Sequence, residues 1–309
     1  MSEAQERKPL ISVVIPTYNE RKRIRYCLAS IFSQQSPHPF EVIVVDSSED
    51  ETQEIVKREF PDVKLIRRDQ QTFAAEARNI GIDHAEGSVV AFIDADCVAE
   101  PNWLGAVARV RDCAGAAVGG AIILNSPTTV AGAALFAVEF SEYGRGSFRR
   151  EIRWLPSCNL AVKRSTLDKY GKFPIDMQAS EDMLFTRQLR QRSGAPLYFD
   201  PDMRIRHTNA NTLSQMRDKL STLGYWSGRS RATGLIPGGV LLRYPIAIPM
   251  LVPYRLIVIV GRLLFWSRDF RLIAIALLGW PLLLFGLAGW ALAFFRGVQA
   301  VSDRGARAG

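Results

Sequence analysis

Residues 88–96 read SVVAFIDAD, an uninterrupted apolar run that ends in two acidic residues separated by one alanine. Runs of similar character lie at residues 10–15 (LISVVI) and 41–45 (EVIVV), and a weaker one lies at 63–66. Strands that are buried on both faces, as in a parallel sheet, have this composition because neither face meets water. We therefore predict four strands in the first third of the chain.

Helical patterns separate these runs. We expect a short helix at Thr52–Phe60 and an alanine-rich one at Phe73–His84, and the first helix carries an apolar stripe at helical spacing. The stripe consists of Ile24, Cys27, Leu28, Ile31 and Phe32. Alternating strands and helices predict a doubly wound, mostly parallel α/β sheet with right-handed crossovers.

Polar residues follow three of the predicted strands. Residues 16–20 read PTYNE, residues 46–50 read DSSED, and residues 94–96 read DAD. Any one of these acids could be a helix N-cap or a turn residue. Ligands of such sheets bind beyond the carboxyl ends of the strands, so three acidic strand ends together favour one binding crevice.

The phosphate-binding motifs of other nucleotide-binding proteins are missing from the sequence. There is no GxGxxG after the first strand and no GxxxxGK[ST] segment, which excludes dinucleotide and P-loop sites. Two carboxylates one residue apart at the end of a strand can both turn toward one Mg²⁺ or Mn²⁺, and such ions bridge to substrate phosphates. We therefore expect Asp94 and Asp96 to hold a divalent ion.

An ordered series of segments over residues 9–235 resembles the family 2 glycosyltransferases of the GT-A fold. The segments are IPTYNE (15–20), VVD with an acidic serine run (44–50), ARNIG (77–81), IDAD (93–96), SCNLAVKRSTLDKYGKFP (157–174), SEDMLFTRQLR (180–190) and YFDPDMRIRHTN (198–209). The chain departs from the family at the second strand, where DDGS is usual and this sequence has Asp46-Ser47-Ser48. The departure falls next to Asp46, the residue that the resemblance places at the base.

The resemblance implies a role for individual residues. Asp182 would be the general base, Asn159 and Glu181 would line the acceptor and sugar pocket, and His207 would join Asp94 and Asp96 at the metal. The nucleotide-sugar-binding residues would be Pro16, Thr17, Tyr18, Glu20, Asp46, Arg78, Asp94 and Asp96. Glu181 and Asp182 could instead be an acidic pair that favours a helix N-terminus, and His207 could face solvent.

The chemistry of sugar transfer fits these residues. A divalent ion stabilises the charge that grows on a departing diphosphate, and a carboxylate within hydrogen-bond reach removes the proton of the attacking hydroxyl. Direct displacement inverts the anomeric centre, so we expect an inverting enzyme.

Composition excludes several classes of protein. The chain has 309 residues, 48% of them hydrophobic and 23% charged, which is too apolar for a disordered chain and long enough for roughly two domains. Its four cysteines lie far apart without a CxxC pair, which argues against a disulfide scaffold or a structural zinc site and fits a reducing compartment. The polar N-terminus and short first apolar run predict no signal peptide.

The C-terminal third predicts a membrane-associated region. Residues 272–295 carry no charge and are long enough to cross a bilayer core of about 30 Å. Residues 240–266 are apolar but interrupted by arginines and prolines, and would either span or lie in the interface. The expected division is a nucleotide-sugar half (1–124), an acceptor half with the base (125–236), a membrane region (237–296) and a polar tail (297–309).

The basic charge is concentrated beside these apolar segments. Residues 203–271 contain ten arginines and one lysine against two aspartates. An anionic cytoplasmic leaflet attracts such a segment, whereas no basic-aromatic motif favours nucleic acid. We therefore expect the inner membrane, with the catalytic domain on its cytoplasmic face, where nucleotide sugars are made.

The expected function is transfer of a sugar from a nucleoside diphosphate sugar to a lipid-linked or envelope-polysaccharide acceptor. A processive synthase is less favoured because residues 224–229 do not match its QxxRW segment and the apolar segments are few. A membrane-tethered inactive scaffold would have no use for intact Asp94, Asp96 and Asp182. A nucleotidyltransferase would need a glycine-rich basic loop near the first strand.

Overall fold

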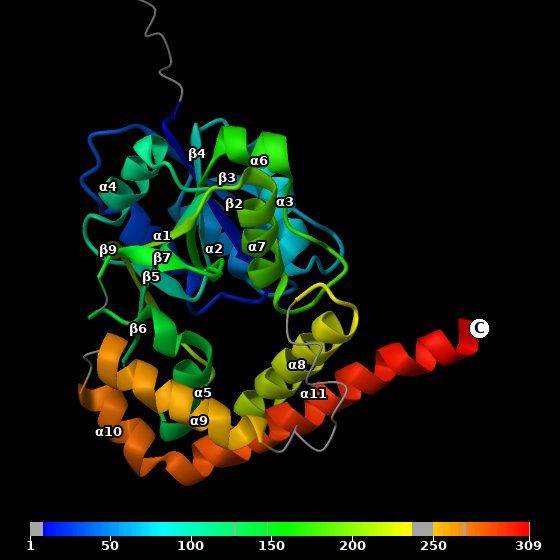
Figure 1. The fold of residues 1–309 in the computed structure, drawn as a ribbon. Helices are drawn as coiled ribbons and strands as arrows, with labels where there is room; N and C mark the ends of the chain where they lie inside the picture. Colours follow the sequence, from blue (N-terminus) through cyan, green and yellow to red (C-terminus); the bar gives the residue numbers. More distant parts are fainter. Residues whose placement is uncertain (1–8, 127, 147, 237–249, 268–269, 309) are drawn as a thin grey trace, which may run out of the picture. The chain divides into compact units, whose positions relative to one another are not determined.

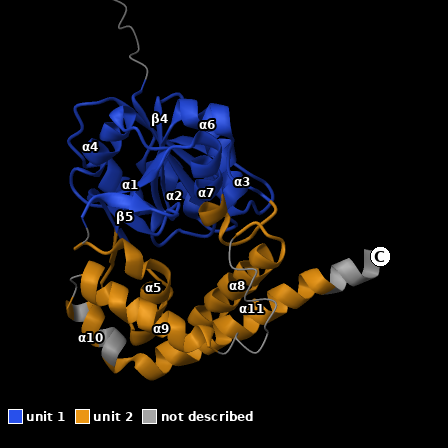
Figure 2. Cartoon of the chain, in the orientation of Figure 1, with its two compact units in different colours: residues 1–121, 148–175, 185–207 blue, residues 122–147, 176–184, 208–309 orange. Residues whose placement is uncertain are grey.

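The computed structural model describes residues 9–126, 128–146, 148–236, 250–267 and 270–308 (Figure 1). The chain forms two compact units, each built from several segments (Figure 2). The first unit comprises Met1–Ala121, Phe148–Ile175 and Phe185–His207, and the second comprises Ile122–Ser147, Asp176–Leu184 and Thr208–Gly309.

The predicted parallel strands are confirmed. They are β1 (Ile11–Thr17), β2 (Phe40–Asp46), β3 (Lys64–Arg67) and β4 (Val89–Ile93), and they lie in the spatial order β3-β2-β1-β4. All residues of β4 and the first five of β1 are buried, as strands covered on both faces should be.

The sheet continues beyond β4 with antiparallel pairs. Strand β8 (Asn159–Lys163) pairs with β4 and with β6 (Ala117–Leu124), while β9 (Leu197–His207) pairs with β5 (Cys97–Ala99) and β7 (Arg150–Ile152). Short strands of this kind have no strong periodicity, and the sequence patterns above did not predict them.

Helices α1 (Ile24–Phe32), α2 (Thr52–Glu59) and α3 (Ala74–His84) connect the parallel strands, as predicted. Gly81 of α3 lies directly against β1, because a Cβ placed there would be 2.2 Å from Cγ1 of Val14. The glycine of the ARNIG segment therefore permits close packing of the helix on the sheet.

Further helices complete the first unit. They are α4 (Trp103–Ala108), the 3-10 turn η1 (Arg109–Asp112), α6 (Arg164–Tyr170) and most of α7 (Glu181–Ser193), whose first four residues belong to the second unit. Aromatic rings join these elements to the sheet: Phe173 lies 5.2 Å from Phe92 of β4 and 3.9 Å from Phe185 of α7, between ring centroids.

The second unit is helical. It contains α5 (Val130–Phe140), the 3-10 turn η2 (Ser141–Tyr143), α8 (Leu213–Ala232), α9 (Leu251–Arg262), a π-helical turn η5 (Leu263–Ser267), α10 (Phe270–Leu278) and α11 (Trp280–Ala308). Helix α8 begins with a capping box, in which Thr212 accepts from the Gln215 amide and the Gln215 side chain accepts from the Thr212 amide.

The prediction of one continuous helix over residues 272–295 is wrong. Helix α10 ends at Leu278 and α11 begins at Trp280, with Gly279 between them. Pro281 explains the break, because its ring excludes the preceding helical turn but fits the first turn of a new helix. Helix α11 also runs through the predicted polar tail, as far as Ala308.

The second predicted apolar segment, 240–266, is described only in part. Residues 240–249 lie outside the described residues, and the rest forms α9 and part of η5. Within the described part of the chain, one helical stretch, Trp280–Ser302, is long and apolar enough to cross a membrane, and 44% of its most apolar window is buried inside the protein. Length and composition alone are weak evidence for spanning.

Candidate active site

The ends of β1, β2 and β4 meet at one edge of the sheet. Strands β1 and β2 are in register up to Thr17 and Asp46, and the Ser47 amide donates to the Thr17 carbonyl at 3.2 Å. Strand β4 flanks β1 on its other side, with Phe92 opposite Val14. The segments PTYNE, DSSED and DAD therefore emerge side by side, as the strand pattern predicted.

The first two of these loops hold each other in place. The Asn19 amide donates to Oγ of Ser48 at 2.7 Å, and Oδ1 of Asn19 accepts from the Glu49 amide at 3.0 Å. Asn19 has φ +56°, a left-handed conformation that asparagine tolerates better than most residues. The Glu20 amide donates to Oγ1 of Thr52 at 3.0 Å. The loop that contains Tyr18 is thus fixed before any ligand binds.

Asp46 is fully buried below this loop. Its carboxylate accepts from Oγ of Ser48 at 2.6 Å and from the Ser48 amide at 3.2 Å. Burial raises the pKa of Asp46, and the Ser48 hydrogen bonds oppose that rise. Ser48 lies where the chain departs from DDGS, so this departure supplies the partner of Asp46. The predicted contact of Asp46 with a base stays a prediction.

Arg78 of α3 is bound to Asp94. Its Nη2 lies 2.6 Å from Oδ1 of Asp94, its guanidinium lies 5.5 Å from the Phe173 ring centroid, and its side chain is only 3% exposed. Asp94 is 31% exposed. In this structure the buried guanidinium of Arg78 therefore orients the carboxylate of Asp94, the first acid of the DAD segment. Its predicted action on the nucleotide stays a prediction.

Pairing of β5 with β9 brings His207 to the acidic motif. Cys97 lies opposite His207 in the register, so Nε2 of His207 is 3.7 Å from Oδ1 of Asp96. Ligand atoms of Asp96, Cys97 and His207 all lie within 4.8 Å of one another. Asp96 and Cys97 are neighbours in the sequence, whereas His207 lies 110 residues after Cys97.

The side chains of this cluster are of types that hold divalent ions. Burial raises the pKa of the Cys97 thiol well above its usual value, and its Sγ donates to Oδ1 of Asp96 at 3.5 Å. The carboxylate of Asp96 is the ligand type that Mg²⁺ and Mn²⁺ prefer, and His207 adds an imidazole. Two protein ligands leave room for water and substrate oxygens, as Mg²⁺ and Mn²⁺ sites require.

Sequence reasoning did not select Arg23, which lies beside this cluster. Its Nε and Nη2 donate to both carboxylate oxygens of Glu20 at 2.6 and 2.9 Å, and its Nη1 is 3.9 Å from Oδ2 of Asp96. Burial raises the pKa of Glu20 to about 7, partly offset by Arg23. The run Arg21-Lys22-Arg23 after PTYNE was the only signal in the sequence.

The remaining predicted residues have different surroundings. Pro16 and Tyr18 are partly exposed at the end of β1. Asn159 is fully buried: its Nδ2 donates to the carbonyls of Ala121 and Met203, and its Oδ1 accepts from Nε1 of Trp103. These contacts give Asn159 a structural role in the sheet. Its predicted place in the sugar pocket stays a prediction.

Glu181 and Asp182 are the first two residues of α7, in the part of this helix that belongs to the second unit. Ser180 before them has φ +67°, and Oδ1 of Asp182 accepts from the Met183 amide at 2.7 Å. Both acids are partly exposed. A helix N-terminus favours an ionised carboxylate, which suits a general base, but the role of Asp182 stays a prediction.

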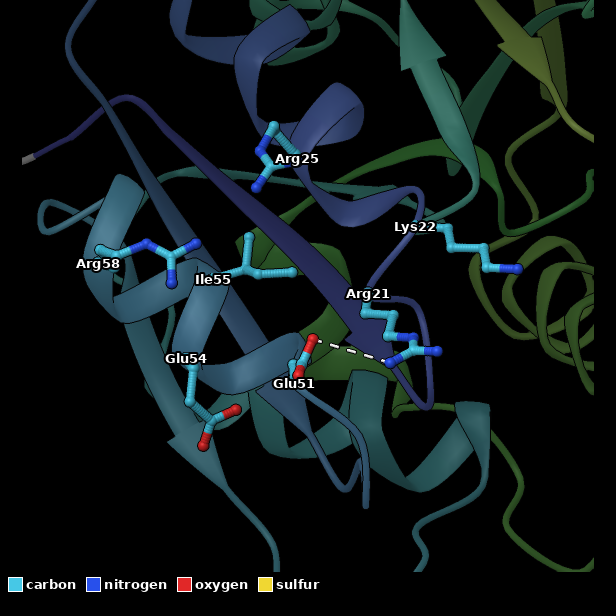
Figure 3. Close-up of a pocket in the computed structure, with 7 residues that line it drawn as sticks. All are labelled: Arg21, Lys22, Arg25, Glu51, Glu54, Ile55 and Arg58. Atoms are coloured by element: carbon cyan, nitrogen blue, oxygen red, sulfur yellow. Dashed lines mark ion pairs between the residues drawn. The ribbon is translucent and has the colours of Figure 1, made fainter.

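A hollow of about 570 Å³ lies between α1 and α2 (Figure 3). Its lining comprises Arg21, Lys22, Arg25, Glu51, Glu54, Ile55 and Arg58. Arg21 and Glu51 form an ion pair across it at 3.7 Å. None of the predicted site residues lines this hollow, so it is separate from the cluster at the strand ends.

Comparison with known proteins agrees with this geometry. The family model described as "Glycosyl transferase family 2" matches residues 12–171, which include β1 to β4 and the acidic motif. The chain belongs to glycosyl transferase family 2.

Relatives and solved structures extend the similarity. Glycosyltransferase AglE of Haloferax volcanii is 29% identical over 204 residues, which are 63% of this chain and 66% of AglE. The glucosyl-dolichyl phosphate glucuronosyltransferase of the same organism is 25% identical over 240 residues, 72% of this chain and 76% of that protein. The chain thus spans about two thirds of AglE.

The fold is shared with the mannosyltransferase PcManGT from Pyrobaculum calidifontis, solved in complex with GDP-Man and Mn²⁺. The TM-score is 0.62 at 20% identity, covering 94% of this chain and 88% of the other. The predicted α/β fold of the GT-A type is therefore confirmed.

Proposed function

We propose that the chain is an inverting, metal-dependent glycosyltransferase that moves a sugar from a nucleoside diphosphate sugar to a hydroxyl group of a membrane-associated acceptor. One observation carries the proposal: Asp96 and His207 lie 3.7 Å apart, at the edge where the ends of β1, β2 and β4 meet. Family membership and the nucleotide sugar and Mn²⁺ of PcManGT support it.

The residues at the strand ends would bind the donor. Asp96 and His207 would hold Mg²⁺ or Mn²⁺, and Arg78 pairs with Asp94, two residues before Asp96. The bound ion would supply Lewis-acid stabilisation of the leaving diphosphate. Tyr18 and the fixed loop around it would position the base and ribose, because a preorganised loop loses little entropy when the ligand binds.

Asp182 would accept the proton of the acceptor hydroxyl while the oxygen attacks the anomeric carbon. The bond from that carbon to the diphosphate breaks in the same displacement, so the configuration inverts and no covalent enzyme adduct forms. Asp182 lies in the first turn of α7, where the helix dipole favours negative charge. Glu181 beside it would contact the acceptor.

A lipid-linked or envelope-polysaccharide acceptor fits the apolar C-terminal helices. The similarity to the glucosyl-dolichyl phosphate glucuronosyltransferase, whose name indicates a lipid-linked acceptor, also supports an acceptor of this class. We place the enzyme at the inner membrane with its catalytic part in the cytosol, where nucleotide sugars are made. Donor binding would reside in residues 1–124, and acceptor binding in residues 125–236.

The proposal is tested by incubating the purified full chain with membrane lipid extract, Mn²⁺ and each of a panel of nucleotide sugars. Release of nucleoside diphosphate and a product one sugar heavier by mass spectrometry are expected, with the opposite anomeric configuration by NMR. Asp182→Asn should lower turnover on the order of 10²- to 10⁴-fold with little change in donor affinity. Asp176→Asn, an exposed acid in the same segment, is the matched control.

Each alternative has a distinct result. A ladder of products would indicate a processive synthase, and donor binding without turnover would indicate an inactive scaffold. Retention of the anomeric configuration, or normal turnover in Asp182→Asn, would refute the proposed mechanism.

A further inference from the structure

Helix α9 has its charged side chains on the side that faces the protein. Arg255 lies 4.1 Å above the Trp290 ring centroid of α11, and Arg262 forms an ion pair of 2.7 Å with Glu142 of η2. Ile259, between the two arginines on the same side, is 2% exposed. Burial lowers the pKa of Arg255 to about 10. Arg255 is thus withdrawn from solvent, whereas Arg262 is 32% exposed and is paired with a side chain of the protein.

The outward side of α9 is apolar. Tyr254 and Ile257 are 63% and 71% exposed. A helix on the surface of a soluble protein has the opposite arrangement, with apolar residues inside and charges outside. This inverted polarity indicates that the outward side of α9 faces something other than water.

The same character continues through the next three elements, which pack on one another at the C-terminal end of the second unit (Figure 1, gold to red). Large apolar side chains from α9 to α11, each more than half exposed, make up what we call the apolar surface. They are Tyr254, Ile257, Leu264, Phe265, Phe270, Leu278, Trp280, Phe285 and Leu292. Large apolar side chains exposed on neighbouring elements often mark a protein or membrane interaction site.

The charge of this region points to a lipid bilayer as the partner. Residues 250–309 contain seven arginines and two aspartates, without lysine or glutamate. Arg255 and Arg262 are engaged with the protein, but Arg296 of α11 is exposed, and an exposed arginine beside apolar surface can reach the phosphates of anionic lipids. Trp280 and Tyr254 are residues that favour the membrane interface. A second copy of the chain would carry the same positive charge and would be repelled.

The packing of α11 argues against a transmembrane position. Helix α8 lies against its middle at backbone distance: a Cβ on Gly224 would be 2.2 Å from the Trp290 carbonyl oxygen, and one on Gly228 would be 2.1 Å from that of Phe294. Gly297 of α11 is equally close to the Tyr225 carbonyl, at 2.0 Å. Any movement of α11 into a bilayer would therefore take α8 with it.

Helix α8 is too polar to cross a bilayer. Arg217, Asp218 and Lys219 are more than half exposed, and Arg229 follows ten residues after Lys219. Ten helical residues rise about 15 Å, only half of the roughly 30 Å core. Charges would be placed in the hydrocarbon, where they are costly.

We propose that the second unit binds an anionic membrane surface from one side: the apolar surface enters a single leaflet, α8 stays in water, and α9 to α11 do not cross. The inference concerns attachment alone and does not depend on the catalytic assignments above. Its tests read lipid binding and sidedness, so they can fail independently of turnover.

The first test measures flotation of the purified full chain with phosphatidylcholine vesicles with and without phosphatidylglycerol. We expect stronger binding to the anionic vesicles. Replacing both Ile257 and Phe265 by glutamate should lower the partition coefficient at least tenfold. Tyr26→Glu on α1, where the residue is 63% exposed, should leave it unchanged. An equal loss of vesicle binding in the Tyr26→Glu control would overturn the proposal. A dimer detected by light scattering that does not bind either kind of vesicle would also overturn it.

The second test determines sidedness in a bacterial host. The four native cysteines are buried, so single reporters can be added as Ser214→Cys on α8, Leu278→Cys and Ser302→Cys. An impermeant maleimide added to the outer face of spheroplasts should label none of these cysteines. The same reagent added to the cytoplasmic face should label Ser214→Cys. Labelling of Ser302→Cys from the outer face would indicate one spanning helix. Labelling of Leu278→Cys from the outer face would indicate two spanning segments. Either result would overturn the proposal.

Discussion

The ion pair between Arg78 and Asp94 gives an asymmetric prediction, because its two members differ in exposure. The side chain of Arg78 is 3% exposed and that of Asp94 is 31% exposed. Asp94→Ala leaves a buried guanidinium without this carboxylate, which costs about 3 kcal/mol or more in folding free energy. Arg78→Met keeps the packing on Phe173 and leaves a carboxylate that water reaches, so about 1.5–2 kcal/mol is expected, near the low end for a charged hydrogen bond.

The double variant Arg78→Met/Asp94→Ala should be less destabilised than the sum of the single variants, with a coupling of roughly 2 kcal/mol. Urea unfolding of the full chain, followed by circular dichroism and tryptophan fluorescence, measures the three values. Additive effects, or a larger loss in Arg78→Met than in Asp94→Ala, would refute the positioning role of Arg78. Unchanged stability with weaker nucleotide binding would show instead that Arg78 acts on the ligand directly.

Three other outcomes are expected. Asp96→Ala should abolish the rise in melting temperature that Mn²⁺ with nucleotide gives, and Asp62→Ala, an exposed acid elsewhere, should retain it. Gly81→Ala should cost about 1–3 kcal/mol of stability in urea unfolding because the new methyl group overlaps Val14, and Val14→Ala should relieve part of that loss. Two arginines lower the pKa of Glu59, whose side chain is 26% exposed, to about 2, so its ionised form stabilises the fold above pH 4.5. The melting-temperature difference from Glu59→Gln should shrink as the pH falls from 4.5 toward 2.

Much of the first unit could be predicted from local patterns. The parallel strands are continuous apolar runs, and the stripe from Ile24 to Ile31 is buried as its spacing indicates. The position of Asp94 and Asp96 followed from the strand that ends just before them. These features depend on neighbouring residues, which a sequence displays directly.

Features that depend on distant residues were not predictable in this way. Strand β5 has three residues, and only its pairing with β9 places His207 beside Asp96. Arg23 became part of the site through Glu20 and the folded loop around it. The break at Gly279 was missed for another reason: hydropathy was uniform across it, although Pro281 was a visible signal.

The close approach of α8 and α11 has a consequence for anyone who shortens this protein. Met216 and Leu220 of α8 are buried, and Gly286 of α11 lies against them. A chain cut before α11 would therefore expose these apolar side chains of α8 to water. Such a fragment should aggregate and not become a well-behaved soluble enzyme. Trimming should remove both helices or neither.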